Sequence, residues 1–198
     1  MSFFLFCVLG VSGTLAQHPK LLLTKEELGY MKQHMNEVPA FGRVVDDLLQ
    51  KADEACAAAI QIPTPVDGGG GAVHEQHKSN YYAMFHAGLA YQYTGHKKYA
   101  DFVAQMLMEY AQKYPKWGLH PVNLSPVPGR LFWQTLNESV WLVHTAMAYD
   151  CVYDALSAKQ RKFIEKNLLF NMADFIMNGY GDRKGNHEMF NRMHNHAT

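Results

Sequence analysis

The sequence has no excess of either charge, because Lys and Arg together number 18 and Asp and Glu also number 18 among its 198 residues. A protein that binds nucleic acid or an anionic membrane surface needs a basic excess to neutralise phosphates, so neither partner is expected. The sequence also lacks an apolar run as long as the ~20 residues of a membrane-spanning helix. No segment alternates apolar and polar residues as a half-buried strand does, so we expect no β-sheet within these residues.

Cysteine is scarce, with three in the whole sequence. Cys7 lies in the apolar N-terminal segment, whereas Cys56 and Cys151 lie in apolar helical patterns, where a small hydrophobic role is expected. A disulfide between Cys56 and Cys151 stays open if the compartment is oxidising. The spacing of the cysteines does not match a zinc site.

The N-terminus has the pattern of a secretory signal peptide. Residues 3–11 are apolar, and the small residues at 12–16 are typical of a cleavage site. The basic residues that usually precede the apolar run are missing, since Met1 and Ser2 carry no charge. We expect residues 1–16 to be a signal peptide, residues 17–198 to form the folded part, and the protein to be periplasmic or secreted.

The rest of the sequence predicts helices joined by short turns. Thr24 with Glu27 and Ser157 with Gln160 form capping boxes that mark two helix starts, and Pro39 is expected to end the first helix. Apolar residues at helical spacing mark six helices, which begin near Leu28, Val44, Met84, Tyr99, Val140 and Phe163. This pattern predicts an all-α fold of antiparallel helix hairpins, either a solenoid or the first part of an incomplete α/α toroid. No repeat of fixed period is visible, which disfavours the solenoid.

Three polar segments, residues 74–82, 130–138 and 187–196, fall in predicted loops or at predicted helix starts. A toroid places such loops around one end of a central groove, so the three segments would meet at one site. The 11 histidines and the 13% aromatic content are typical of a sugar-binding groove and equally of a well-filled helical core.

Two histidine pairs, His74 with His77 and His194 with His196, are candidate metal ligands. Metal sites add carboxylate or thiolate ligands at reasonably fixed spacing, and neither pair forms a known zinc signature with the nearby Glu75 or Glu188. We therefore expect no metal and no other cofactor in this chain.

Glycoside hydrolysis would need two carboxylates that flank one bond. The candidates are Glu138 and Asp150, with Asp101 and Glu188 as further carboxylates. Only Glu138 lies within a dense polar and aromatic cluster, and Asp150 has the pattern of an ordinary helix end. The signal for a hydrolase is weak.

The residue types fit β-elimination on a uronic-acid polymer better. This reaction removes the weakly acidic proton on C5, so hydrogen-bond donors must neutralise the adjacent carboxylate and stabilise the enolate-like intermediate. Asn195 and His196 are adjacent donors of the right type, and Arg130 would supply a charge-assisted contact to an anionic sugar. A Tyr or His would act as base and a Tyr as acid. The alternative is that Asn195 and His196 only cap a helix or satisfy loop backbone.

Five segments carry a resemblance to a known family. They are His18-Pro19, residues 74–81 (HEQHKSNY), residues 118–121 (GLHP), residues 128–138 (PGRLFWQTLNE) and residues 194–198 (HNHAT). Together, and in this order over nearly the whole sequence after residue 16, they resemble the alginate lyases of polysaccharide lyase family 17, which belong with the heparinase II/III-like enzymes. The resemblance implies an N-terminal α/α toroid followed by a β-sandwich, and a carbon-oxygen lyase that acts on alginate or oligoalginate, often exolytically.

The resemblance also implies site residues. Asn195 and His196 would neutralise the substrate carboxylate as the catalytic pair of this chain. Residues that would bind the acidic polysaccharide are Arg130, Gln134, Asn137, His77, Tyr81 and His194. The family's catalytic tyrosines and its sandwich domain would lie beyond Thr198, so we expect this chain alone to be an inactive fragment with exposed apolar helix faces.

Two other functions stay open. The first is a lyase on another uronic-acid polymer, such as a heparin-like chain, whose sulfates would call for more basic residues than Lys78, Arg130 and Arg192. The second is a non-catalytic helical module that binds a glycan. A glycoside hydrolase ranks behind both.

Overall fold

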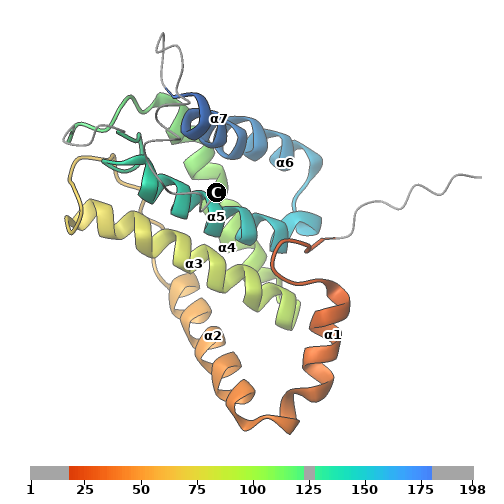
Figure 1. Ribbon diagram of the computed structural model, residues 1–198. Coiled ribbons are helices and arrows are strands. Elements are labelled where there is room, and N and C mark those ends of the chain that lie inside the picture. Colours follow the sequence, from red (N-terminus) through yellow and green to blue (C-terminus); the bar gives the residue numbers. More distant parts are fainter. Residues whose placement is uncertain (1–17, 123–127, 180–198) are drawn as a thin grey trace, which may run out of the picture.

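The computed structural model describes residues 18–122 and 128–179, which form an all-α fold (Figure 1). The helices are α1 Lys25–His34, α2 Pro39–Ala57, α3 Ala72–Thr94, α4 Lys97–Lys113, α5 Thr135–Val152, α6 Ala158–Ile164 and α7 Phe170–Asn178. Short 3-10 turns follow α1, α4 and α5 at Met35–Glu37, Tyr114–Lys116 and Tyr153–Ala155, and a π-helical turn, Glu165–Leu169, joins α6 to α7. No strand occurs within the described residues, so the all-α prediction is confirmed.

Helices α3 and α5 lie side by side and run in the same direction (Figure 1). Near their N-terminal ends the side chains of His74 and Asn137 are in contact, and one turn or two further along the Tyr81 ring lies 4.7 Å from the His144 ring. Close approach is possible later in the pair because Gly88 has no side chain to separate the helices. The parallel pairing brings the starts of two helices, 63 residues apart in sequence, to one end of the fold.

Helices α3 and α4 form the predicted hairpin. Gly95 ends α3 with φ 73°, a left-handed conformation that glycine adopts without steric cost. Helix α4 then returns along α3 and packs on both α3 and α5. Its buried residues, among them Tyr110, fill the space between these helices.

The helix starts agree with the sequence in part. Both capping boxes are present, with Thr24 and Ser157 as N-caps. Pro39 does not end the first helix as expected, because it is the first residue of α2, where its missing N–H costs nothing. Segment 74–82 is helical from its first residue, since the Asp67 carboxylate accepts hydrogen bonds from the backbone N–H groups of Val73 and His74 and so caps α3 from the preceding loop.

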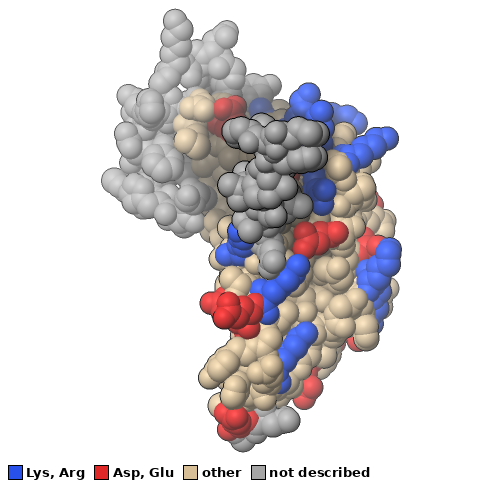
Figure 2. Space-filling model, turned by 90° about the vertical axis from the view of Figure 1, so that its right-hand side faces the viewer, with Lys and Arg blue, Asp and Glu red and all other residues tan. Residues whose placement is uncertain are grey.

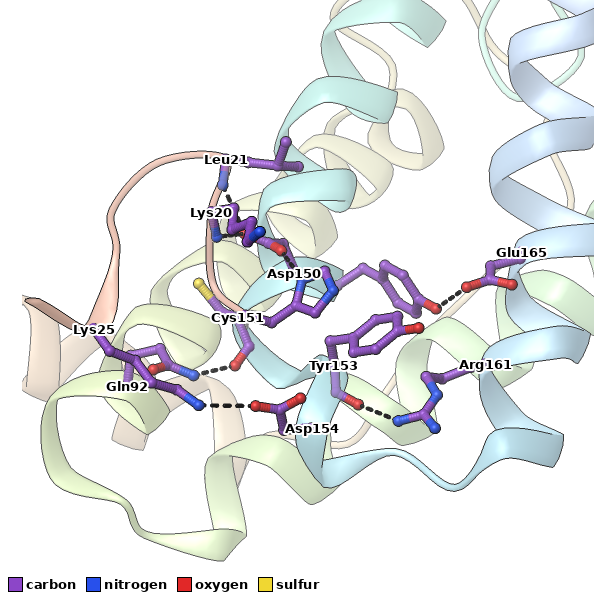
Figure 3. Close-up of polar contacts among 12 residues, drawn as sticks. Lys20, Leu21, Lys25, Gln92, Asp150, Cys151, Tyr153, Asp154, Arg161 and Glu165 are labelled. Atoms are coloured by element: carbon purple, nitrogen blue, oxygen red, sulfur yellow. Dashed lines mark hydrogen bonds and ion pairs between the residues drawn. The ribbon is translucent and has the colours of Figure 1, made fainter. Parts of the chain in front are cut away.

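Asp150 holds the N-terminal segment against the C-terminal end of α5 (Figure 3). Its carboxylate lies 2.5 Å from His18 Nδ1 and accepts backbone hydrogen bonds from Lys20 and Leu21 at 2.6 and 2.8 Å. The His18 ring also stacks on Tyr153 at 3.9 Å. Asp150 lies near the end of α5 as the sequence indicated, but its contacts with residues 18–21 were not predicted.

Cys56 and Cys151 are both free thiols. Among the helices that the structure describes, none combines the length and the apolar character that crossing a bilayer would demand. On the face shown in Figure 2, Lys and Arg side chains are interspersed with Asp and Glu side chains, as expected for a sequence without net charge. Ion pairs among the described residues include Lys51 with Asp47 and Lys98 with Asp53.

Candidate functional site

The candidate site lies where the N-terminal ends of α3 and α5 meet the loop that precedes α5. Segment 130–138, singled out by its dense polar and aromatic composition, forms that loop and the first turn of α5. Segment 74–82 lies beside it at the start of α3. Two of the three polar segments predicted to meet therefore do so.

Arg130 is half-buried, and three side chains from two other elements contact its guanidinium group. Its Nη1 donates a hydrogen bond to Asn171 Oδ1 at 2.9 Å. The guanidinium carbon lies 4.7 Å from the centre of the Phe175 ring and 5.4 Å from that of Tyr114, distances typical of cation–π contacts. We call Arg130, Tyr114, Asn171 and Phe175 the Arg130 cluster.

Glu138 lies beneath this cluster and is 0% exposed. One of its oxygens accepts a hydrogen bond from the Tyr114 hydroxyl at 2.6 Å, and the other accepts one from the backbone N–H of Arg130 at 2.8 Å. Burial raises the pKa of Glu138 to about 7, although hydrogen bonds from Tyr114, Arg130 and Leu131 act in the opposite direction.

The loop before α5 is held tightly at its base. The His120 N–H donates a hydrogen bond to the carbonyl of Gly129 at 2.8 Å, which closes the loop. A side chain at Gly129 would collide with the Glu138 carboxylate and with the carbonyl of Phe132. The backbone next to Arg130 is thus held between the Glu138 carboxylate and the hydrogen bond from His120 to Gly129.

His74 and Asn137 join the starts of α3 and α5. The Asn137 amide lies 3.1 Å from His74 Nε2, so the amide N–H donates when this ring nitrogen carries no proton. Burial lowers the pKa of His74, which favours that neutral ring. His74 Nδ1 and Trp133 Nε1 are buried and have no hydrogen-bond partner among the described residues.

His77 and Tyr81 lie deeper than a substrate contact would suggest. His77 is 0% exposed, its Nδ1 lies 2.8 Å from the Tyr110 hydroxyl, and burial lowers its pKa to about 4. Tyr81 is buried and its ring contacts those of Tyr82 and His144, at 4.4 and 4.7 Å. Both side chains face the core in this structure, and their predicted role in binding substrate stays a prediction.

The remaining predicted site residues divide into two groups. Gln134 is half-buried and is the residue directly before α5, and Asn137 is half-buried in the first turn of that helix. Both lie on the same segment as Arg130. His194, Asn195 and His196 lie outside the described residues.

Neither a metal site nor a hydrolase pair is found at this location. No group of three or more potential metal-ligating side chains occurs within residues 18–122 and 128–179. Glu138 and Asp150 lie near opposite ends of α5, about 18 Å apart along the helix axis. Because glycosidase carboxylates are about 5 to 9.5 Å apart, these two residues cannot act on one glycosidic bond.

Sequence reasoning missed Tyr114, Asn171 and Phe175. The first follows α4, and the other two lie on α7, so no motif connects them to Arg130. The π-helical turn before α7 changes the helical register between Phe163 and Phe175, and no feature of the apolar periodicity indicates it.

Comparison with known proteins gives a consistent result. The sequence pattern of the alginate lyase family matches residues 31–198. An exo-oligoalginate lyase from Saccharophagus degradans is 38% identical over 181 residues, which cover 91% of this chain and 24% of that protein. An alginate lyase from Stenotrophomonas maltophilia is 45% identical over 141 residues, which cover 71% of this chain and 18% of that protein. The chain thus spans a quarter or less of the length of these relatives.

Proposed function

Since the chain belongs to the alginate lyase family, we propose that the whole protein is a polysaccharide lyase that cleaves alginate or oligoalginate by β-elimination. The observation that carries this proposal is the placement of Arg130. Arg130 is half-buried, and Asn171, Tyr114 and Phe175 hold its guanidinium group beside the first turn of α5. A cation held in this way suits the carboxylate of a uronate residue.

In the proposed reaction a base removes the proton on C5 of a uronate residue. Electrons from the C–H bond form the C4=C5 double bond, the C4–O4 bond breaks, and the leaving O4 takes a proton from an acid. The step is slow unless the carboxylate on C5 is neutralised, because its charge opposes the build-up of negative charge in the transition state.

The residues of this chain take the neutralising and binding part of that chemistry. Asn195 and His196 donate to the carboxylate of the reacting sugar. Arg130 contacts a uronate carboxylate, and the polar groups around it, Gln134 and Asn137, bind sugar hydroxyls. The base and the acid lie on other parts of the longer protein.

An unsulfated polymer suits this site better than a heparin-like chain. Lys78, the other basic residue near the start of α3, pairs with Glu75 at 2.9 Å. A sulfated substrate would need several cations in one groove, and within the described residues the Arg130 cluster contains one. We therefore place alginate before other uronic-acid polymers.

We also propose that the protein is exported to the periplasm or secreted. The support is the apolar run at residues 3–11, followed by small residues up to Ala16. Mass spectrometry of the protein from a periplasmic or extracellular fraction should find Gln17 at its N-terminus. Intact residues 1–16 on the exported protein would contradict the proposal.

The decisive experiment measures ultraviolet absorbance of the conjugated double bond when the full-length protein acts on alginate. The wild-type protein should form unsaturated uronates, and the N195A/H196A variant should form almost none. The matched control is H34A/N178A, which removes an imidazole on α1 and an amide on α7 outside the three polar segments and should retain most of the activity. Binding of oligoalginate without any unsaturated product from the wild type would select a non-catalytic binding protein instead.

A further inference from the structure

One buried carboxylate holds Arg130 at both ends of the residue. Glu138 accepts a hydrogen bond from the backbone N–H of Arg130 at 2.8 Å. It also accepts one from the hydroxyl of Tyr114 at 2.6 Å, and the ring of Tyr114 lies 5.4 Å from the Arg130 guanidinium. Glu138 therefore fixes the backbone of Arg130. Through the Tyr114 hydroxyl it also fixes the ring that the Arg130 guanidinium contacts.

This arrangement addresses a cost that every arginine in a binding site carries. A free arginine side chain loses rotamer entropy when it is immobilised on a ligand. A side chain that is already held in its binding geometry loses less at that moment, so more of the contact energy remains for catalysis. Asn171 and Phe175 restrict the guanidinium further, from the side of α7.

Glu138 itself does not reach the substrate. It is 0% exposed, and its two oxygens already accept hydrogen bonds from Tyr114 and Arg130, so it cannot exchange a proton with a sugar. A purely structural role is also a poor account. A carboxylate is an expensive residue to bury, and an apolar residue of similar volume is often at least as stabilising.

We propose that Glu138 is a positioning residue for the lyase reaction, which acts by orienting Arg130 toward a uronate carboxylate of the substrate. The inference rests on the proposed function, since the orientation matters only if Arg130 contacts an acidic sugar. Tyr114 has the same role, because its hydroxyl is bound by Glu138 and its ring contacts the Arg130 guanidinium.

The test is a double-mutant cycle on the full-length protein with oligoalginate. Glu138→Gln should lower kcat/KM by about tenfold, a mid-range effect for residues in one network. In the R130A background the same substitution should change kcat/KM by less than about twofold, because the residue that Glu138 orients is gone. Affinity for oligoalginate, measured in parallel by calorimetry, should likewise fall in E138Q and should not fall further when E138Q is added to R130A.

Two further variants keep the test decisive. Tyr114→Phe keeps the ring but removes the hydroxyl. This substitution should also reduce kcat/KM when Arg130 is present and leave it unchanged in the R130A background. Tyr114→Phe takes the place of E138Q if E138Q fails to fold. Asp150→Asn, at the other end of α5, is the control and should leave kcat/KM unchanged in both backgrounds.

The outcomes separate the two proposals. If the wild type cleaves alginate and E138Q and R130A act additively, Glu138 is structural and the positioning role is overturned while the lyase function stands. If the wild type binds oligoalginate without cleaving it, the lyase function fails, and the same cycle in the binding constants decides the positioning role. If the wild type neither binds nor cleaves, both are overturned.

Discussion

His18 and Asp150 lie 132 residues apart in sequence and only 2.5 Å apart in space (Figure 3). The same carboxylate accepts hydrogen bonds from the backbone of Lys20 and Leu21. Helix α1, which follows this segment, contributes no buried residue. The contacts of one buried carboxylate are therefore a main attachment of the N-terminal segment to the rest of the fold.

The substitution D150A should detach this segment and lower the free energy of unfolding by about 3 kcal/mol, because it removes three hydrogen bonds that the segment makes to a charged group. Urea unfolding measures the loss. Limited proteolysis near Leu21 should become faster in D150A than in the wild type, since the segment no longer lies against α5.

The control for this prediction is Asp154→Ala. Asp154 pairs with Lys25 at 2.9 Å on the surface, and exposed pairs contribute less than about 1 kcal/mol. Equal losses of stability in D150A and D154A would contradict the attachment role of Asp150.

Glu138 should make the protein less stable as the pH rises. Its pKa is about 7 in the folded state and 4.5 without the fold, so between these values the folded state keeps a proton that the unfolded chain releases. The contribution of the neutral Glu138 carboxyl to the free energy of unfolding is fully present below pH ~4.5. It is lost, by roughly 3 kcal/mol in all, as the pH rises through 7. Glutamine does not titrate, so the free energy of unfolding of E138Q should not change for this reason. The difference between E138Q and the wild type, measured by urea unfolding, should therefore rise by the same amount between these two pH values.

His77 provides a control of opposite sign. Its pKa falls from 6.5 to about 4 on burial, so its contribution is complete above pH ~6.5 and is lost as the pH falls through the folded-state pKa. The stability of His77→Gln minus that of the wild type should therefore rise as the pH falls. If the two differences changed with pH in the same direction, at least one of the two residues would not titrate as the structure indicates.

The fold was largely predictable because its signals are local. Thr24 with Glu27 and Ser157 with Gln160 cap helices through residues three positions apart, and the apolar spacing within each helix needs no knowledge of its neighbours. Pro39 was misplaced because the missing N–H and the fixed φ of proline, which end one helix, also suit the first position of the next helix.

The site was predictable only where one segment carries it. Arg130, Gln134 and Asn137 stand within eight positions of each other, and the motif indicated all three. The partners of Arg130 on α7, Asn171 and Phe175, are far away in sequence, and their approach depends on how the helices pack. His77 is a different case, since its side chain is buried and contacts the Tyr110 hydroxyl, a contact that the sequence did not indicate, and its role in binding substrate stays a prediction.

The parallel contact of α3 and α5 should depend on Gly88. A Cβ at this position would lie 3.2 Å from the Cα of Ala148 and from the Cβ of Cys151, closer than packed side chains normally approach. Gly88→Ala should therefore lower the free energy of unfolding by about 2 kcal/mol through overpacking, as measured by urea unfolding.

Gly42→Ala is the matched control for Gly88→Ala. Gly42 lies within α2 and a Cβ there would meet nothing within 4 Å. Alanine has the higher helix propensity, so this variant should be more stable by about 0.5–1 kcal/mol. A gain of stability in G88A as well would mean that α3 and α5 are not in the close contact described.

Replacing Arg130 with lysine separates charge from geometry in the proposed site. Lysine keeps the positive charge, but it lacks the planar group that lies against Tyr114 and Phe175 while donating to Asn171. In the full-length protein R130K should raise KM for oligoalginate severalfold and retain more activity than R130A. The matched control is Arg161→Lys, because Arg161 also lies on a tyrosine ring, 4.6 Å from that of Tyr153, and donates to backbone carbonyls. R161K should lose stability and keep the wild-type KM; an unchanged KM in R130K would remove Arg130 from the substrate site.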